Sequence, residues 1–388
     1  MPALSNLASR FVVAIPACNE EARIEGCLRA LAGQRGARCD HVVLLLNNCT
    51  DDTAGVVERL RPKLAMPVTV AVRDLPASLS NAGYARSQAL ALAAGIAGPD
   101  GIVATTDADG MVDMDWVART RSAFALGVEA VCGRAVIDPV EAMLISSALH
   151  DDDAREVAYG AMLDKIHALV DPDPWDPLPR HTEHSGASIA ATVSAYRRAG
   201  GMPPLPTGED HGFLLALRTV DARIRHAPEV HVTVSGRLQG RAVGGMADTM
   251  ARRMIRQDEM LDADLEPAPT CLRRAGLRAQ ARAAWTQRAQ ASPSWHGPVR
   301  ILSREAALPE EAITAWLRTE YFGKAWASIE AASPALVKVP VPRRALDRHV
   351  AAAARILASL RSPGLRSEVP ADAAGPADSR SDAEVRLR

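Results

Sequence analysis

The sequence lacks several features that would assign it to a protein class directly. Its six cysteines form no CxxC pair, which argues against a disulfide framework or a cysteine-based zinc site and is typical of free thiols in a reducing cytoplasm. No stretch approaches the roughly 18 uninterrupted apolar residues of a membrane span. The chain does not open with a charged segment followed by a long apolar run, so we expect no signal peptide and a cytoplasmic location.

Lysine is also scarce, with only four in 388 residues, and almost all the basic charge is arginine. The formal net charge of -1 argues against general nucleic-acid binding. A hydrophobic content of 48% and a charged content of 23% are those of a globular protein, long enough to bury one large core or two smaller ones.

Strand-like and helix-like patterns alternate through the first third of the chain. Short apolar runs typical of buried strands occur at 11–15, 42–46, 68–72 and 102–106. Helical spacing of apolar residues follows them near 24–31, 56–64, 84–97 and 116–126. This alternation predicts a Rossmann-like α/β fold, with a mainly parallel sheet and helices on both faces. In such sheets, ligands bind at the carboxyl ends of the strands.

The pattern beyond residue 128 is less regular. Residues 138–184 form a polar, proline-punctuated insertion, flanked by a strand at 130–137. A helix over 208–220 and a pair of strands over 223–237 follow it. We therefore predict an α/β domain at 1–246, a helical region at 247–365 and a disordered tail, poor in large apolar residues, at 366–388.

The predicted strand ends carry amides and carboxylates. A dinucleotide-binding GxGxxG turn is absent, because the first strand ends in "PACNEE", and no P-loop GK[ST] exists. A pair of aspartates, Asp107 and Asp109, follows the fourth strand. A diphosphate placed about 4 Å from a bare carboxylate would be repelled by about 4 kcal/mol at an effective dielectric near 20. A divalent cation such as Mg²⁺ or Mn²⁺ reverses that sign, so the pair favours a metal bridge to a nucleotide diphosphate over an ordinary solvated turn.

Five segments, in this order and at this spacing, resemble family 2 glycosyltransferases with the GT-A fold. They are "VVAIPACNEEARIEGCLRAL", "VVLLLNNCTDDTAGVV", "NAGYARSQAL", "TTDADG" and "YRRAGGMPPLPTGED". The resemblance covers about residues 11–241, and the C-terminal third lies outside it. It implies transfer of a sugar from a nucleotide-diphosphate sugar to a hydroxyl acceptor that the sequence does not identify.

The resemblance also implies roles for individual residues. Asp210 would be the general base, with Glu209 beside it, and Asp107 and Asp109 would hold the metal. His231 is a candidate third ligand, although an ordinary strand histidine explains it equally well. The donor nucleotide-sugar would contact Pro16, Asn19, Glu20, Asn47, Asn48, Arg86, Asp107, Ala108, Arg237 and Arg241. Within that set, Arg86 would face the base or diphosphate, and Arg237 and Arg241 could clamp phosphates.

Other interpretations stay open at this stage. The family often has aspartate where this chain has Asn47 and Asn48, and an amide can donate or accept, so the donor base is undetermined. A retaining relative, such as a sugar-3-phosphoglycerate synthase, and a non-catalytic GT-A-like binding protein are the alternatives to an inverting enzyme. A nucleotidyltransferase would want a glycine-rich loop that is absent.

Two further motifs favour ordinary structural explanations. "HTEH", at 181–184, has ligand-like spacing, but a polar loop is favoured over a metal site. The arginine-rich stretch at 272–285 could lie on an anionic membrane surface, but a solvated amphipathic helix is favoured.

Overall fold

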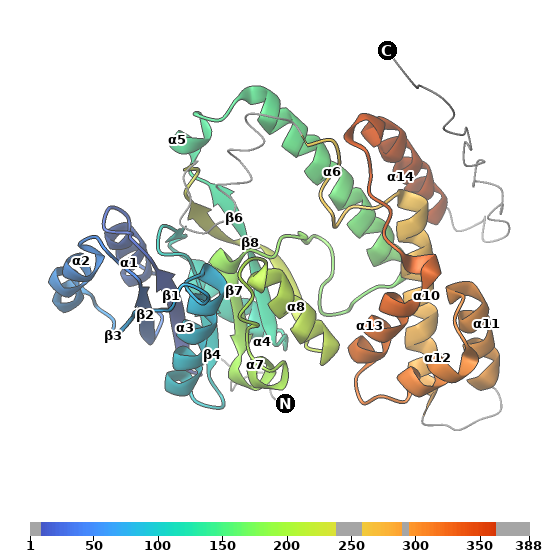
Figure 1. Cartoon of the computed structure of the whole chain (residues 1–388), viewed down its shortest axis with the longest axis horizontal. Helices are drawn as coiled ribbons and strands as arrows, with labels where there is room; N and C mark the ends of the chain where they lie inside the picture. The colour runs from blue at the N-terminus through green and yellow to red at the C-terminus, as the bar shows by residue number, and fades with distance from the viewer. Residues whose placement is uncertain (1–8, 238–257, 289–294, 362–388) are drawn as a thin grey trace, which may run out of the picture.

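The computed structural model describes residues 9–237, 258–288 and 295–361 (Figure 1). The strands are β1 (Phe11–Ala17), β2 (His41–Asn47), β3 (Val68–Arg73), β4 (Ile102–Thr105), β5 (Met111–Val112), β6 (Ala130–Ile137), β7 (Ile189–Thr192) and β8 (Ile224–Val234). The helices up to β8 are α1 (Ile24–Ala32), α2 (Thr53–Leu60), α3 (Ala82–Ala97), α4 (Trp116–Ala125), α5 (Pro139–Ala142), α6 (Ser147–Val170), α7 (Val193–Arg198) and α8 (Glu209–Thr219). The later helices are α10 (Ala268–Gln287), α11 (His296–Ala306), α12 (Glu310–Leu317), α13 (Phe322–Ala332) and α14 (Leu346–Arg361).

The eight strands form one mixed sheet in the order β3-β2-β1-β4-β7-β6-β8-β5. Strands β1 to β4 are mutually parallel where they pair, and β7 runs antiparallel between β4 and β6. Strand β8 is parallel to β6, and the short β5 pairs antiparallel with β8 at the edge. The predicted α/β class and helical C-terminal region are therefore confirmed for the described residues.

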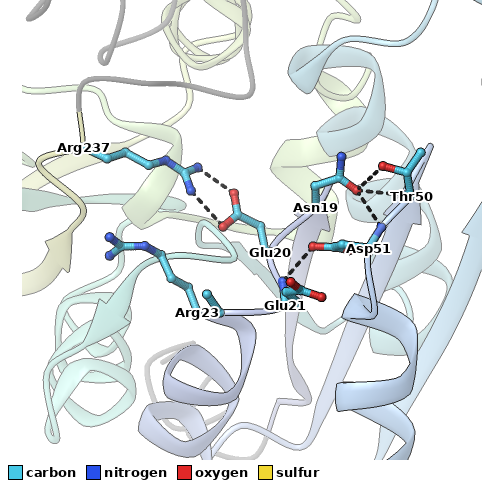
Figure 2. A pocket seen from close by; sticks show the side chains of 8 residues that line it. Asn19, Glu20, Glu21, Arg23, Thr50, Asp51 and Arg237 are labelled. Atoms are coloured by element: carbon cyan, nitrogen blue, oxygen red, sulfur yellow. Dashed lines mark hydrogen bonds and ion pairs between the residues drawn. The ribbon is translucent and has the colours of Figure 1, made fainter.

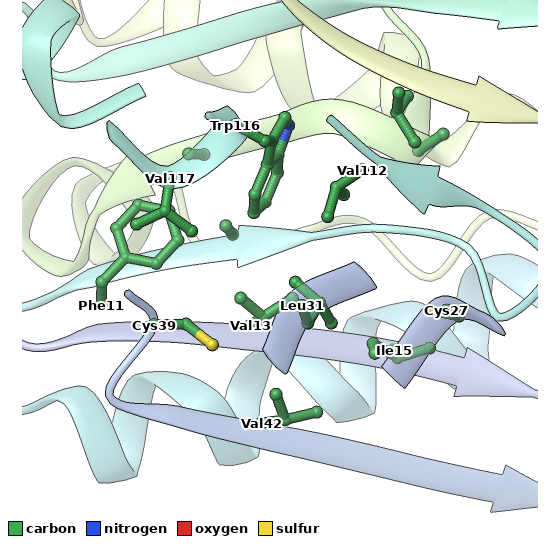
Figure 3. Close-up of a cluster of buried hydrophobic side chains, with 14 of the residues drawn as sticks. Phe11, Val13, Ile15, Cys27, Leu31, Cys39, Val42, Val112, Trp116 and Val117 are labelled. Carbon is green, nitrogen blue, oxygen red and sulfur yellow. The ribbon is translucent and has the colours of Figure 1, made fainter. Parts of the chain in front are cut away.

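Alternate residues of the central strands face two separate cores. Phe11, Val13 and Ile15 point to the core covered by α1, α2 and α4 (Figure 3), whereas Val12 and Ala14 point to the core under α3, α7 and α8. Because side chains alternate across a strand, a strand buried on both faces is apolar at every position. This is why the continuous apolar runs predicted the strands.

Helix α6 departs from the predicted polar insertion at 138–184. It is a 24-residue helix whose buried side chains, Tyr159, Leu163 and Ile166, pack with apolar residues of α10 and α14. Figure 1 shows it beside the C-terminal helices, at the upper edge of the sheet domain. The chain thus leaves the α/β domain, contributes a helix to the helical region, and returns to form β7.

The structure corrects a second element and explains the arginine-rich stretch. The expected strand pair at 223–237 is one eleven-residue strand, β8, whose pairing with β6 shifts register between Cys132 and Arg134. The arginine-rich helix α10 is packed rather than simply solvated, since Arg274 is buried and bonded to Glu266. No helix among the described residues is long and apolar enough to cross a membrane. All six cysteines are free thiols.

Candidate functional site

The ends of β1 and β2 form one wall of a pocket lined by residues 19–23, 50–51 and Arg237 (Figure 2). Asn19 adopts a left-handed backbone conformation, with φ 54°, at the turn after β1. Its side-chain oxygen accepts hydrogen bonds from the Thr50 and Asp51 backbone N–H groups, at 2.7 and 3.3 Å. The Asn19 amide therefore holds the two loops together at the carboxyl edge of the sheet. Its predicted contact with the donor nucleoside stays a prediction.

The neighbouring amides are placed differently from one another. Asn47, the last residue of β2, is buried. Asn48 also has a positive φ, of 52°, and its side chain bonds the backbone of Leu75 through both its nitrogen and its oxygen. The Asn48 side chain thus supports the loop after β3, whereas Asn47 lies at the carboxyl end of β2 itself.

Pro16 and Ala108 are two further residues that were expected to contact the donor nucleotide-sugar, and both lie where the backbone shapes the site. Pro16 lies within β1 opposite Leu45, beyond the last residue of β1 that pairs with β4. It therefore costs no hydrogen bond to β4. Ala108 is buried between the two aspartates. Arg241 lies outside the described residues.

The two aspartates sit in the turn between β4 and β5, and each contacts an arginine. Asp107 Oδ1 accepts a hydrogen bond from Arg86 Nη2 at 2.6 Å, and Asp109 Oδ2 lies 3.2 Å from Arg237 Nη2. Burial raises the pKa of Asp109 to about 6, and the negative charge of Asp107 adds to the rise. Asp109 is therefore a carboxylate that is held in an unfavourable charged state at neutral pH.

Arg237 provides the nearest positive charge to Asp109. Its two terminal nitrogens donate to both Glu20 oxygens, at 2.6 and 2.9 Å, in the fork geometry of a bidentate pair (Figure 2). That pairing also raises the pKa of Arg237. One guanidinium thus lies between Glu20 from the β1 turn and Asp109 from the β4 turn.

Arg86, on α3, is enclosed beneath the aspartates rather than open to the pocket. Its nitrogens donate to Asp107, to Glu209 Oε1 at 3.0 Å, and to two further oxygens, those of the Thr105 hydroxyl and the Gly186 carbonyl. The side chain is only 7% exposed. Since all three nitrogens are bonded to protein groups, Arg86 positions the aspartate turn against α8, which differs from the expected contact with the base or diphosphate.

Asp210 lies in the first turn of α8, next to the Arg86 network. Its Oδ2 accepts a hydrogen bond from the Gly186 N–H at 2.9 Å, and its Oδ1 accepts one from the His211 N–H at 2.8 Å. Each oxygen keeps lone-pair capacity for another donor. Gly186 has no recognisable sequence signal, because only the fold brings residue 186 to α8; a Cβ there would approach the Arg86 guanidinium to 2.9 Å.

His231 does not join the aspartate pair. Its Nδ1 lies 3.5 Å from Asp113 Oδ2, whereas the next residue of β8, Val232, is the one that approaches Gly110 in the aspartate turn. Successive side chains of a strand point to opposite faces, so His231 is directed away from that turn. The candidate role of His231 as third metal ligand stays a prediction.

The donor atoms around the turn suit a hard divalent cation. Carboxylate oxygens from Asp107, Asp109 and Glu20 are the ligand type that Mg²⁺ and Mn²⁺ prefer. A cation there would also relieve the charge that raises the pKa of Asp109. The residues present thus fit a divalent metal.

A different set of ligating side chains was not predicted. Among the described residues, the group of three that lies within 4.8 Å is His184, His211 and Asp264. The "HTEH" spacing drew attention to His184, but His211 and Asp264 are distant in sequence and no spacing rule joins them.

Comparison with known proteins finds a family model that matches part of the chain. Residues 12–162 match the family model described as "Glycosyl transferase family 2". No curated protein matches the chain.

Solved structures similar to this chain include three glycosyltransferases of low identity. S. aureus TarS 1-349 in complex with UDP has 17% identity and a TM-score of 0.43, covering 83% of this chain and 90% of its own. The mannosyltransferase PcManGT from Pyrobaculum calidifontis, in complex with GDP-Man and Mn²⁺, has 18% identity and a TM-score of 0.39, covering 91% and 85%. Glucosyl-3-phosphoglycerate synthase from Mycobacterium tuberculosis has 19% identity and a TM-score of 0.38, covering 65% and 80%.

Proposed function

We propose that this chain, whose residues 12–162 match the family 2 glycosyltransferase model, transfers a sugar from a nucleotide-diphosphate sugar to a hydroxyl acceptor with inversion at the anomeric carbon. The reaction would use a divalent metal at the β4–β5 turn and a carboxylate base on α8. The observation that carries the proposal is the Arg86 network, because it joins these two places through one buried side chain.

The donor would bind at the carboxyl ends of β1, β2 and β4. Asn19, Glu20 and Asn47 would face the nucleoside, and Asp107 and Asp109 would hold Mg²⁺ or Mn²⁺. The metal would supply charge neutralisation for the diphosphate leaving group. Arg237, which is paired with Glu20 and Asp109 in this structure, could then exchange those carboxylates for diphosphate oxygens, since its fork geometry suits both.

Asp210 would remove the proton from the acceptor hydroxyl. The Gly186 and His211 N–H groups fix the orientation of its carboxylate without using all its lone pairs. Glu209, bonded to Arg86, would keep the start of α8 in place rather than react. In an inverting transfer, the base acts on the face of the sugar opposite the leaving diphosphate.

Replacement of the base tests the proposal. Asp210→Asn keeps the shape of the side chain but cannot accept a proton, so kcat should fall by roughly 10²–10⁴ while donor affinity stays nearly unchanged. Initial rates with a panel of nucleotide-sugars, together with donor binding by calorimetry, measure the two effects separately. Asp221→Asn is unsuitable as a control because Asp221 caps α13; Glu25→Gln, in an exposed i,i+4 pair with Arg29, is the matched control.

The anomeric configuration of the product gives a second, independent test. NMR of the product formed from an α-linked donor should show a β-linkage. An α-linked product would overturn the inverting mechanism and favour the retaining alternative, and an unchanged kcat in Asp210→Asn would remove Asp210 from the chemistry.

A further inference from the structure

The chain holds a second group of potential metal-ligating side chains, separate from the aspartate pair and close to Asp210. His184 precedes the short turn that contains Gly186, His211 is the third residue of α8, and Asp264 lies just before α10. The His184 Nε2 and His211 Nδ1 atoms are each 3.8 Å from Asp264 Oδ2. Two imidazoles and a carboxylate thus converge from three separate segments of the chain.

Direct hydrogen bonding does not account for this convergence. A distance of 3.8 Å is too long for an N–H···O hydrogen bond, whose usual upper limit is about 3.2 Å. The other oxygen of Asp264, Oδ1, is bonded to Lys338 Nζ at 3.1 Å. Asp264 Oδ2 therefore faces two ring nitrogens across a gap that is wider than a hydrogen bond.

His184 Nδ1 and His226 Nε2 are both buried without a hydrogen-bond partner, and their rings are neighbours with centroids 6.2 Å apart. His226 is buried, and its Nδ1 contacts Asp176 Oδ2 at 2.7 Å. That carboxylate can only accept, so it makes Nδ1 the protonated nitrogen of neutral His226 and leaves Nε2 as an acceptor.

One protonation pattern gives both unpaired nitrogens a role, although they are not bonded to each other in this structure. If His184 carries its proton on Nδ1, that N–H can serve the acceptor Nε2 of the neighbouring His226 ring. The His184 Nε2 lone pair then faces the Asp264 carboxylate, and a cation between these two electron-rich atoms would stabilise the arrangement. Metal-binding histidines commonly have this arrangement, with the remote ring N–H directed to an acceptor.

We propose that His184, His211 and Asp264 bind a zinc-class divalent cation, separate from the metal of the β4–β5 turn. Two nitrogens and one oxygen are a ligand set that Zn²⁺ accepts, with a fourth position left for water or another ligand. Ligands of a tetrahedral Zn²⁺ lie about 3.4 Å apart. The two nitrogen–oxygen distances of 3.8 Å are close to this spacing, and the ligand atoms of all three residues lie within 4.8 Å of one another.

The site would join the start of the helical region to the surroundings of Asp210. His211 follows Asp210 directly, and His184 lies two residues before Gly186, whose N–H donates to Asp210. Asp264 belongs to the segment leading into α10. A bound cation would therefore fasten this segment to both supports of the Asp210 carboxylate.

Metal binding can be measured without turnover, so the test is independent of the proposed transfer reaction. The full-length chain, stripped of metal and carrying Asp109→Asn to remove the turn site, is titrated with Zn²⁺ and then with Co²⁺ as a visible probe. We expect one ion per chain, with the absorption of a tetrahedral nitrogen- and oxygen-ligated Co²⁺. Adding His211→Gln or Asp264→Asn should weaken binding at least about 100-fold, since each removes one of three ligands.

The control is His231→Gln in the same background, because His231 is a partly exposed histidine outside the cluster, and its replacement should leave affinity unchanged. Circular dichroism establishes that each variant is folded, and the conservative Asp264→Asn serves if His211→Gln is not. Equal Zn²⁺ affinity with and without His211→Gln and Asp264→Asn, or no binding tighter than about 100 µM, would overturn the proposal.

Discussion

Arg86 illustrates how one side chain can decide the geometry of a site. Its three nitrogens bond four oxygens that come from β4, the aspartate turn, the segment at residue 186 and α8. A lysine could offer only one nitrogen, without the planar fork, so it could not hold these groups in the same arrangement. The buried charges of Asp107 and Glu209 are compensated by this guanidinium, whose pKa they raise further.

The ionised Asp109 carboxylate is expected to lower the stability of the metal-free protein while making metal binding possible. Its pKa is raised from 3.8 to about 6 in the folded protein, so its contribution to stability is fully present below about pH 3.8 and is lost as pH rises through about 6. Asp109→Asn should therefore stabilise the metal-free protein at pH 7.5 by about 1–3 kcal/mol. The gain should shrink toward pH 5, where wild-type Asp109 is mostly protonated, and thermal melts in EDTA at the two pH values measure it.

Manganese should make wild type more stable relative to Asp109→Asn, because only the wild-type carboxylate can bind it. Added Mn²⁺ is expected to raise the Tm of wild type but not of Asp109→Asn. Asp115→Asn, in a half-exposed pair with Arg119, is the control and should respond to Mn²⁺ as wild type does. A metal-free Asp109→Asn that melts below wild type at pH 7.5 would contradict the argument.

Residue order in the sequence was enough to find part of the site. Asp107, Asp109 and Glu209 follow predicted strands or start predicted helices, so a motif and an edge of a sheet locate them. Gly186 and Asp264 have no such signal, since each is brought to the site by contacts between distant segments. His231 was proposed from the family resemblance, whereas a one-residue phase of its strand decides which way the side chain points.

At the scale of elements, α3 connects the aspartate turn between β4 and β5 to α8. Its N-terminus begins at Asn81, whose side chain accepts a hydrogen bond from the Tyr84 N–H at 2.8 Å. Gly83, in the first turn, packs so closely on the approach to α8 that a Cβ there would lie 1.8 Å from the Leu205 carbonyl oxygen and 3.0 Å from Glu209 Cβ. The absence of a side chain at Gly83 thus sets the distance between α3 and the Glu209–Asp210 pair.

Gly83→Ala should be destabilising, although alanine is the better helix former by about 1 kcal/mol. The clash with a backbone oxygen requires α3 or the 203–208 segment to move, which we expect to cost about 2–4 kcal/mol net and to lower kcat by displacing Asp210. Chemical denaturation and initial rates measure the two effects.

The same helix supplies the control. Gly95 is exposed, and a Cβ there would meet nothing within 4 Å, so Gly95→Ala should stabilise the protein by about 0.5–1 kcal/mol and leave activity unchanged. If both substitutions had the same sign, helix propensity rather than packing would govern position 83.

Elements buried within one domain were predicted well, whereas α6 was not. The runs at 11–15 and 42–46 became β1 and β2 because their pattern reports burial between nearby helices. In α6, only a few apolar residues, among them Tyr159, Leu163 and Ile166, face a core, and acidic residues surround them. Their partners are on α10 and α14, more than 90 residues later, so no local pattern could identify the helix as buried.

For the whole molecule, α6 complicates the proposed division at residue 246. We propose an α/β domain at 1–246 and a helical region at 247–365, with α6 belonging to the first by sequence but packing against the second. Arg343 strengthens this attachment, because it bonds both Asp152 and Glu156 of α6 at 2.5 and 2.7 Å. The two regions are therefore connected by a shared core as well as by the backbone.

A chain ended after Arg237 should not behave as an independent domain. It would expose the α6 face formed by Tyr159, Leu163 and Ile166, so we expect it to aggregate and to bind the dye ANS. Replacing these three residues by glutamine should restore a monomer, as measured by size-exclusion chromatography with light scattering. Glutamine at Val157 and Leu169, which are already exposed, should not help; a monomeric, ANS-negative 1–237 fragment would show that the cover is dispensable.

The position of α6 also has a consequence for synthesis on the ribosome. At about 5–20 residues per second, α10 follows Ile166 out of the ribosome after roughly 5–20 s, and α14 takes longer. Throughout that interval the strands β7 and β8 can join the sheet, but the apolar side of α6 has no permanent cover. The nascent chain thus carries an exposed hydrophobic stripe until α10 and then α14 have been made, which makes residues 159–166 the segment where a chaperone would be needed.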